Sequence, residues 1–264
     1  KKGVDNMYNN IFDTHSHYTD EAFKLDSLAL LDDIHTNNGV KLVMCATVDI
    51  QDSLNTLNLA SKRDFIYCSA GIHPENLDNL QENYIELLEN LVKENPNKIK
   101  AIGEIGLDYH YEGYNAELQK EVFISQMELA KKLNLPVIIH SRNACEDTLE
   151  ILREYQGVKG VMHCYSYSNE VAKEILKLGY YISFTGVITF KNSKKSIKSL
   201  EVVPMDRLML ETDCPYMSPE PFRGQRCNSS MIYRMAEKVA EVKNLEPQQV
   251  LDITYQNGLK FFNI

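Results

Sequence analysis

The 264-residue sequence has no run of 18 or more apolar residues, the length that a membrane-spanning helix would need. It also lacks an excess of positive charge, since 28 lysines and arginines face 37 aspartates and glutamates for a formal net charge of −9. This balance argues against tight, nonspecific binding of duplex nucleic acid. It does not exclude a nucleic-acid substrate, because divalent cations bound in an acidic pocket would reverse the local charge.

The six cysteines are scattered and form no C-x-x-C pair. Such usage is typical of reduced thiols and predicts a cytoplasmic protein rather than a disulfide framework. Residues 1–10 are polar and lack the apolar segment and small-residue cleavage site of a secretory signal. We expect a single domain over residues 7–264, a disordered or foreign N-terminal extension at residues 1–6, and neither a membrane nor an obligate protein partner.

Short apolar runs rich in β-branched residues recur along the chain and predict eight strands. They span residues 11–17, 41–48, 65–73, 99–108, 135–141, 160–165, 180–186 and 207–213. Segments with helical periodicity lie between or after them, at residues 27–37, 77–94, 117–133, 144–155, 169–178, 230–242 and 248–261. This alternation, without an internal repeat or linker, predicts an α/β fold that is a single (β/α)8 TIM-type barrel.

Two histidines near the start of the sequence, His15 and His17, lie two residues apart in a predicted strand. Because side chains alternate between the two faces of a strand, both imidazoles should point the same way. A single histidine at the end of a strand is more often structural. The pair is better explained as two ligands of one metal ion.

Further candidate ligands stand where other predicted strands end. The active centre of such a barrel lies at the carboxyl ends of its strands, so residues distant in sequence converge there. The set of candidates comprises His15, His17, Glu104, His140, His163 and Asp213. Four imidazoles and two carboxylates suffice for two divalent cations if one carboxylate bridges them. Two such cations can clamp a phosphodiester and generate hydroxide near neutral pH.

The two carboxylates have different expected roles. Glu104 lies in Gly103-Glu104-Ile105-Gly106, whose glycines would let the backbone approach a crowded centre, and we expect it to bridge the metal ions. Asp213 is expected to bind one metal ion and to accept a proton from the attacking water. Cys164 and Cys214 neighbour the ligands, but strand alternation should point both thiols away from the centre. Asp108 is expected to support a ligand or a loop.

Three residues are candidates for substrate binding. His73 ends the third predicted strand and could bind a substrate phosphate or have a structural role. Arg142 follows the fifth strand, and Arg223 lies in the irregular stretch at residues 218–228. Both arginines could hold a phosphate through forked hydrogen bonds, or lie on the surface without such a role. The lysines at 191–198 could contact nucleic acid, although a solvated helix face is the simpler interpretation.

Together these motifs resemble those of the TatD family of metal-dependent deoxyribonucleases, within the amidohydrolase-like barrels. The resemblance covers about residues 11–262 and rests on D-T-H-S-H at 13–17, G-I-H-P at 71–74, G-E-I-G-L-D-Y at 103–109, H-S-R at 140–142, H-C-Y-S at 163–166, E-T-D-C-P at 211–215 and P-F-R-G at 221–224. It implies that the six ligands carry over, with Glu104 shared. It also implies hydrolysis of phosphodiester bonds in DNA, with exonuclease character on single strands or 3′ ends, supported by two magnesium, manganese or zinc ions.

Two positions depart from the family pattern. Tyr167 stands where members often have glycine, and residues 227–229 read Cys-Asn-Ser where members often have Asn-Glu-Pro. Both lie in predicted substrate loops, so the polarity of digestion and the preferred substrate stay open. The alternatives are a metal-dependent amide, lactam or ester hydrolase on the same barrel, and a noncatalytic scaffold. Many amide-hydrolysing relatives have a carbamylated lysine where this chain has Glu104, which favours phosphoester chemistry.

Overall fold

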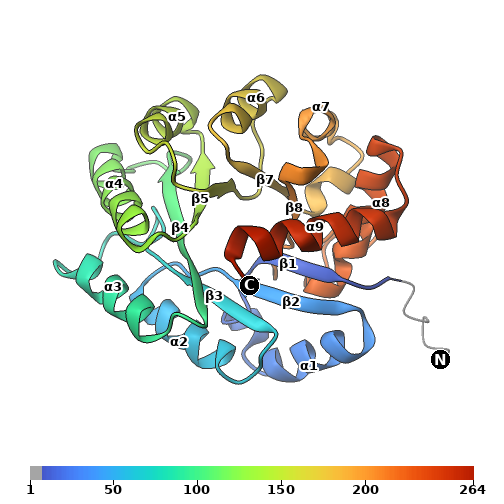
Figure 1. Cartoon of the computed structure of the whole chain (residues 1–264), viewed down its shortest axis with the longest axis horizontal. Helices are drawn as coiled ribbons and strands as arrows, with labels where there is room; N and C mark the ends of the chain where they lie inside the picture. Colours follow the sequence, from blue (N-terminus) through green and yellow to red (C-terminus); the bar gives the residue numbers. More distant parts are fainter. Residues whose placement is uncertain (1–7) are drawn as a thin grey trace.

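The structure is a computed structural model that describes residues 8–264, so the extension predicted at residues 1–6 lies outside the described part. Strands alternate with helices around one barrel (Figure 1). Within the described residues eight strands follow one another in sequence order, and each neighbouring pair from β1 to β8 is parallel. The prediction of a (β/α)8 barrel is confirmed.

Seven of the eight strands are shorter than the apolar runs predicted, and β4 has the predicted length. The strands are β1 (Ile11–Ser16), β2 (Val40–Cys45), β3 (Ile66–Ala70), β4 (Ile99–Asp108), β5 (Val137–Arg142), β6 (Gly160–Met162), β7 (Tyr181–Phe184) and β8 (Leu208–Leu210). His17, His73, His163 and Asp213 therefore lie in the loops just beyond their strands rather than on them. At Asp213 the backbone has left the extended conformation, with φ 57°.

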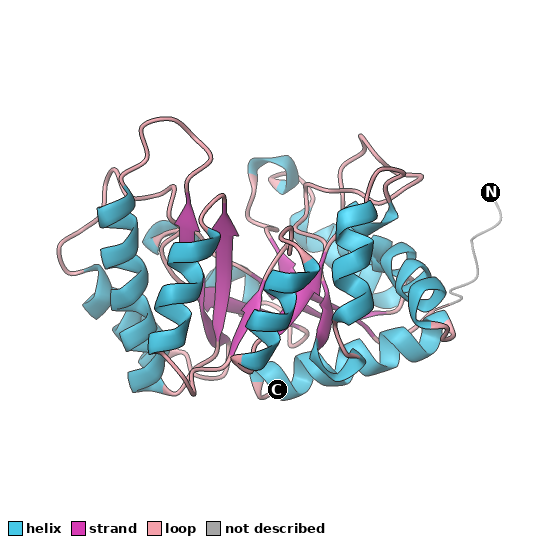
Figure 2. Ribbon diagram, turned by 90° about the horizontal axis from the view of Figure 1, so that it is seen from above, coloured by secondary structure: helices cyan, strands magenta, loops and turns pink. Residues whose placement is uncertain are grey.

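Helices surround the strands (Figure 2). They are α1 (Ser27–Asn37), α2 (Ile50–Ala60), α3 (Tyr84–Glu94), α4 (Ala116–Leu133), α5 (Cys145–Glu154), α6 (Asn169–Lys177), α7 (Lys194–Val202), α8 (Ile232–Lys243) and α9 (Pro247–Phe262), with 3-10 turns η1 (Glu21–Phe23), η2 (Gly186–Thr189), η3 (Met205–Arg207) and η4 (Ser229–Met231). The helical periodicity did not indicate α2, which is rich in polar residues, while α7 was expected only as the solvated helix face that carries the lysines at 191–198. Across residues 8–264, no helix combines the length and apolar character needed to cross a membrane.

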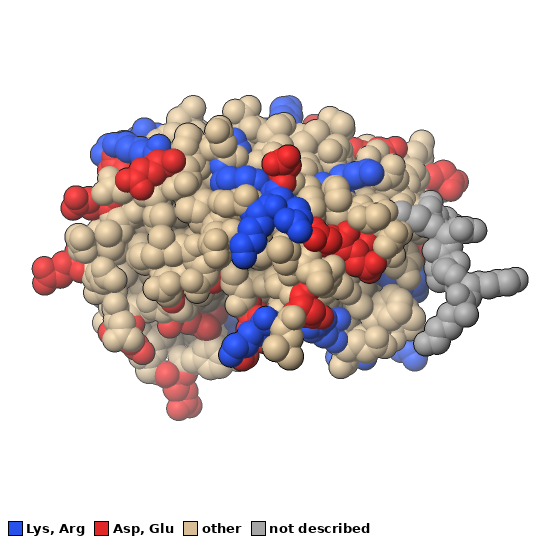
Figure 3. Space-filling view, turned by 90° about the horizontal axis from the view of Figure 1, so that it is seen from below, with Lys and Arg blue, Asp and Glu red and all other residues tan. Residues whose placement is uncertain are grey.

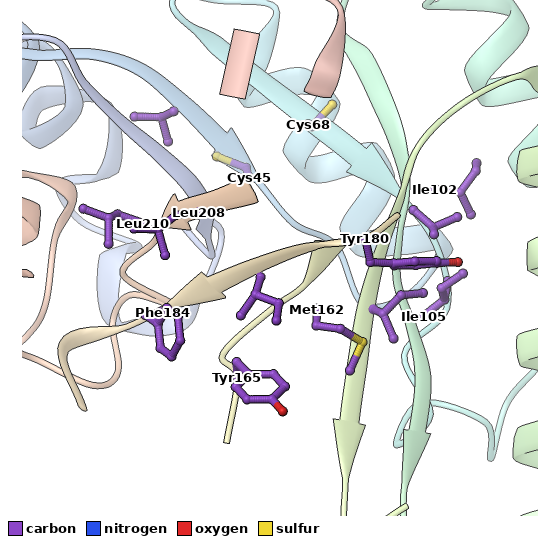
Figure 4. Close-up of a cluster of buried hydrophobic side chains, with 14 of the residues drawn as sticks. Cys45, Cys68, Ile102, Ile105, Met162, Tyr165, Tyr180, Phe184, Leu208 and Leu210 are labelled. Atoms are coloured by element: carbon purple, nitrogen blue, oxygen red, sulfur yellow. The ribbon is translucent and has the colours of Figure 1, made fainter. Parts of the chain in front are cut away.

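Apolar side chains fill two layers. The larger layer packs the strands against the helices, and Figure 4 shows part of it, including Ile102, Ile105 and Phe184. The smaller layer contains Phe12 and Met44 together with Phe261 and Phe262 of α9. Helix α9 crosses the end of the barrel from which the strands start (Figures 1 and 2), so it closes the floor and leaves the opposite end as the mouth.

The barrel closes between β1 and the segment that follows β8. Backbone hydrogen bonds run from Asp213 N to His15 O and from His17 N to Cys214 O, both at 2.9 Å. The Thr14 hydroxyl adds a bond of 3.0 Å to the carbonyl of Leu210. The first and last strands therefore meet directly beside the first pair of histidines.

The outer surface seen over α1 to α3 carries basic and acidic side chains side by side (Figure 3). No broad area of one sign dominates this view, which agrees with the modest net charge of −9. This face therefore has no extended positive surface of the kind that binds duplex nucleic acid.

Candidate metal centre

A cavity of about 780 Å³ opens at the carboxyl ends of the strands, where a barrel of this kind holds its active site. Five of the six predicted ligands line it: His17, Glu104, His140, His163 and Asp213. His15 lies behind them and is fully buried. The structure thus brings together all six residues, which span about two hundred positions of the sequence.

Two glycines bring Glu104 to the centre of this group. A Cβ at Gly103 would lie 2.7 Å from Cβ of Ile138, and one at Gly106, where φ is +143°, would lie 1.9 Å from the carbonyl oxygen of His140. Only residues without a side chain let β4 pass β5 this closely. The glycines therefore permit a close backbone approach, as predicted, but the observed approach is to strand β5 rather than to the metal centre itself.

One side of the centre is formed by His15, His17 and Asp213 with Oε2 of Glu104. The closest approach is 3.0 Å, between Nε2 of His17 and Oδ1 of Asp213. From Nε2 of His15, the distances are 3.2 Å to His17 Nε2, 3.3 Å to Glu104 Oε2 and 3.5 Å to Asp213 Oδ1. Ligand atoms around one tetrahedral zinc ion are roughly 3.3 Å apart, since zinc–nitrogen bonds are about 2.0–2.1 Å long. These side chains therefore fit one divalent cation.

The other oxygen of Glu104 faces a second group of imidazoles. Its Oε1 lies 2.8 Å from Nε2 of His163 and 3.1 Å from Nδ1 of His140. Nε2 of His73 is 3.4 Å from the same oxygen. The two carboxylate oxygens of Glu104 thus face separate groups of imidazole nitrogens, which is the geometry that a carboxylate shared between two cations requires.

Further groups hold the imidazole rings in these orientations. His140 Nε2 lies 2.8 Å from Oδ2 of Asp108, and His17 Nδ1 lies 3.2 Å from the carbonyl oxygen of Ala46. Such contacts fix which ring nitrogen is free to bind metal. The supporting role expected for Asp108 agrees with its contact to His140.

Comparison with known proteins decides the family. Residues 12–263 match the family model described as TatD related DNase. The chain belongs to the TatD family. The family predicted from the motifs is therefore confirmed, and it extends over nearly the whole barrel.

The relatives of this TatD chain are described as hydrolases. It is 38% identical over 256 residues to the uncharacterized metal-dependent hydrolase YabD of Bacillus subtilis, covering 96% of this chain and 99% of the relative. It is 36% identical over 227 residues to the uncharacterized metal-dependent hydrolase YcfH of Escherichia coli, covering 85% and 84%. The crystal structure of YJJV, a TatD homologue from Escherichia coli, superposes with a TM-score of 0.91 at 28% identity, covering 97% and 98%. The chain is a metal-dependent hydrolase of this family.

Glu211 is a buried acidic residue of the TatD centre that was not among the candidate residues predicted from the sequence. Its Oε1 lies 3.0 Å from Nδ1 of His163 and accepts the backbone N–H of Cys164 at 2.7 Å. The signal was present, because Glu211 and Asp213 are two residues apart, as His15 and His17 are.

Asp13 is a second buried acid beneath the TatD centre. It accepts hydrogen bonds from Thr212, through N at 3.0 Å and Oγ1 at 2.5 Å, and from Oγ of Ser229 at 2.6 Å. Burial raises the pKa of Asp13 to about 7, and these hydrogen bonds act in the opposite direction. Asp13 therefore ties β1 to the segment after β8 and to η4.

The electrostatics of the TatD centre favour bound positive charge. Burial opposes ionisation of Glu104, but the imidazoles of His163, His15 and His73 outweigh it and hold the pKa of Glu104 well below its usual range. Burial similarly opposes protonation of His17, yet Asp213 and Glu104 raise the pKa of this imidazole to about 9. The negative charge that raises the pKa of His17 also attracts divalent cations, which compete with protons for the same nitrogen atom.

Two of the three predicted substrate-binding residues lie at the cavity, and the third does not. His73 and Arg142 line the cavity. His73 also belongs to a possible metal-binding group with Glu104 and His140. Arg223 lies outside the cavity lining, and its guanidinium is 4.3 Å from the centroid of the Phe190 ring.

The two cysteines beside the ligands differ from each other. Cys214 is fully buried, as predicted. The prediction was wrong for Cys164, which lines the cavity with its Sγ 3.4 Å from Sδ of Met217. The alternation rule fails there because Cys164 lies beyond β6 and has φ 44°. Burial raises the pKa of Cys164 to about 12, so the thiol stays protonated and is no ready nucleophile.

Proposed function

We propose that this TatD-family hydrolase cleaves phosphodiester bonds in DNA, with exonuclease character, at a centre of two divalent metal ions. The observation that supports this most directly is the placement of Glu104, whose Oε2 lies 3.3 Å from His15 and whose Oε1 lies 2.8 Å from His163. A carboxylate between two ligand groups suits a pair of cations about 3.5–4 Å apart, and such pairs are typical of phosphoester hydrolysis.

The residues divide between the two metal positions. The first would be held by His15, His17, Asp213 and Oε2 of Glu104, and the second by Oε1 of Glu104 with His140 and His163. Imidazole nitrogens suit zinc, whereas carboxylate oxygens suit magnesium and manganese, so this mixed set keeps all three metals as candidates. When bound, the cations lower the pKa of coordinated water and offset charge on the phosphodiester oxygens.

Asp213 is the proposed proton acceptor. Its side chain is 13% exposed and lines the cavity, so it can reach both a ligand position and the substrate. Burial opposes ionisation of Asp213, but the hydrogen bond from His17 and the nearby imidazoles lower its pKa. The carboxylate is therefore ionised near neutral pH and able to accept a proton from an attacking water molecule.

The substrate phosphate has two proposed partners in the cavity. Arg142 ends β5 at the mouth and carries the planar guanidinium that suits forked hydrogen bonds to phosphate. His73 lies deeper and is only 8% exposed, within reach of the second metal position. Arg223 lies beyond the cavity lining, so its proposed contact is with the DNA backbone farther from the cleaved bond.

The proposal also includes a cytoplasmic location and a substrate of single-stranded DNA or 3′ ends. All six cysteines are free, which suits a reducing cytoplasm. The cavity of about 780 Å³ falls in the range of small-molecule sites, roughly 300–1,000 Å³. Single strands or 3′ ends enter such a cavity more readily than an intact duplex does.

An activity survey of the metal-reconstituted protein tests the proposal. The substrates are single-stranded DNA, duplex DNA, RNA, and a panel of amides, lactams and esters. We expect metal-dependent cleavage of single-stranded DNA, abolished by a chelator and by Asp213→Asn. Turnover of an amide, lactam or ester without cleavage of any phosphodiester would instead establish the alternative hydrolase, for which the barrel is equally suited.

A further inference from the structure

An aromatic side chain stands exposed at the mouth of the cavity. Tyr111 lies in the loop between β4 and α4, lines the cavity, and is 58% exposed. Tyr216 is also exposed at the mouth, at 56%, but its hydroxyl is held by Asp20 at 2.9 Å. A large ring left open to water beside a reaction centre is a candidate for contact with the substrate.

The loop that carries Tyr111 is held in place by its neighbours. The hydroxyl of Tyr109 donates to Oδ2 of Asp147 on α5 at 2.7 Å. The rings of Tyr109 and Tyr114 stack, with their centroids 4.5 Å apart and 9° between their planes. Two of the three tyrosines in this segment therefore fix the loop, while the ring of Tyr111 is left facing the cavity.

Tyr111 also has a cationic partner on the next strand. The guanidinium of Arg142 lies 5.6 Å from the centroid of the Tyr111 ring, and the ring of His110 meets it edge-on at 4.9 Å and 78°. A ring backed by a guanidinium group offers a flat surface for stacking, and arginine strengthens such surfaces through cation–π attraction.

The negative charge of the cavity wall near Tyr111 favours contact with an uncharged part of the substrate. Glu75 and Asp108 line the same cavity as Tyr111 and repel phosphate groups that approach without a cation. Stacking on a ring is not weakened by these carboxylates, and every nucleobase has a flat face that can use it. In a duplex those faces are covered by the neighbouring bases, so only an unstacked base could reach the ring.

We propose that Tyr111, backed by Arg142, is the stacking surface for a nucleobase close to the phosphodiester that is cleaved. The inference rests on the proposed function and deepens it, because it assigns the preference for single-stranded or frayed ends to one side chain. Tyr111 acts through binding of the base, while the phosphodiester is handled by the groups around Glu104.

Comparison of two oligomers with the same backbone tests the proposal. One is a short oligothymidylate, and the other has tetrahydrofuran abasic units in place of the nucleosides. The measured quantity is the ratio of kcat/KM between the two oligomers. Wild-type protein should favour oligothymidylate, and Tyr111→Ala should lower the ratio roughly tenfold, mostly through KM. Tyr111→Phe, which keeps the ring, should retain the wild-type ratio.

Glu112→Ala is the matched control, since Glu112 is exposed on the same loop, takes no part in the stack of Tyr109 and Tyr114, and lies outside the cavity lining. It should leave the ratio unchanged. An unchanged ratio in Tyr111→Ala, or an equal fall in both alanine variants, overturns the stacking role. If wild-type protein cleaves neither oligomer, the proposed nuclease function itself fails and the inference falls with it. Cleavage of both oligomers with no preference for bases overturns the inference alone.

Discussion

Glu211 and His163 are joined by a 3.0 Å contact between Oε1 and Nδ1, and both side chains are buried. The opposite nitrogen of this ring, Nε2, lies 2.8 Å from Oε1 of Glu104. Glu211 therefore sets the orientation of His163, a ligand of the second metal ion in the proposed function, without entering the cavity lining. A carboxylate behind a ligating imidazole also makes that imidazole a stronger ligand.

Replacement of Glu211 by glutamine should weaken metal binding. The amide keeps the size of the side chain and can still accept the N–H of Cys164, but it removes the negative charge behind His163. We expect metal affinity to fall by roughly 10- to 100-fold, with activity recovered at high metal concentration. Metal titration followed by calorimetry measures this. Glu201→Gln, on the exposed side of α7, is the control, and equal affinities in both variants would contradict the role of Glu211.

Glu104→Gln should disturb both metal positions together. Its two oxygens face separate groups of imidazoles, so loss of the charge affects both groups, whereas His140→Ala removes a ligand from one group only. We expect the metal content of Glu104→Gln, measured by mass spectrometry of the protein after dialysis, to fall below that of His140→Ala. Turnover should fall by about 100-fold or more, since the metal-bound nucleophile is lost. If Glu104→Gln retained the metal content and turnover of the wild-type protein, Glu104 would not bridge two metal ions.

Removal of metal should lower both activity and thermal stability. A ligand that binds only the folded state at 100 times its dissociation constant adds about 2.7 kcal/mol of unfolding free energy. We expect a chelator to abolish turnover and to lower the Tm of the wild-type protein, with both restored by added divalent cation. Asp213→Asn should show a smaller Tm response, because it weakens one metal position. An identical Tm with and without chelator would argue that no cation is bound.

Asp13→Ala should reduce the stability of the fold. The carboxylate is fully buried and accepts hydrogen bonds from Thr212 and Ser229, so its loss leaves buried donors unpaired. Each unpaired group costs about 1–3 kcal/mol, and we expect a fall of that size or larger in the free energy of unfolding by urea. Asp64→Ala, at an exposed position, should unfold like the wild-type protein. Comparable midpoints for the two variants would refute the structural role of Asp13.

Tyr167→Phe should loosen the loop that follows β5. The Tyr167 hydroxyl lies 2.8 Å from Oγ of Ser141 and accepts the N–H of Ala144 at 3.2 Å. This links the loop after β6 to the start of α5, at a position where TatD members often have glycine. We expect the phenylalanine variant to lose about 1 kcal/mol of unfolding free energy. Faster hydrogen exchange at Ala144, with no change in α9, would locate the effect; unchanged exchange at Ala144 would contradict it.

The barrel and the placement of the candidate metal ligands could be predicted because they depend on local patterns. The alternation of side chains on a strand placed His15 beside His17, and the common end of parallel strands placed Glu104 and His140 near them. Both arguments need only the sequence period and the direction of the chain. The glycines at positions 103 and 106 could be interpreted for the same reason, because absence of a side chain has few structural uses.

The remaining features depend on contacts that no local pattern contains. Cys164 turned toward the cavity because the chain leaves β6 with a positive φ, which the alternation rule cannot anticipate. Arg223 lies beyond the cavity lining, with its guanidinium over the ring of Phe190, a contact between two separate loops that no local pattern predicts. The buried partners of Asp13 come from Thr212 and Ser229, about two hundred positions away, and only the closed barrel brings them together.

The join between the first and last strands bears on how the protein responds when metal is scarce. His15 and His17 lie on one side of this join and Asp213 on the other, and a cation held by all three would act as a clasp across it. When metal is scarce, this cation would be absent, and only individual hydrogen bonds would join the first and last strands. Starvation for divalent ions would then expose the enzyme to proteolysis as well as silence it, so its abundance would follow the supply of metal.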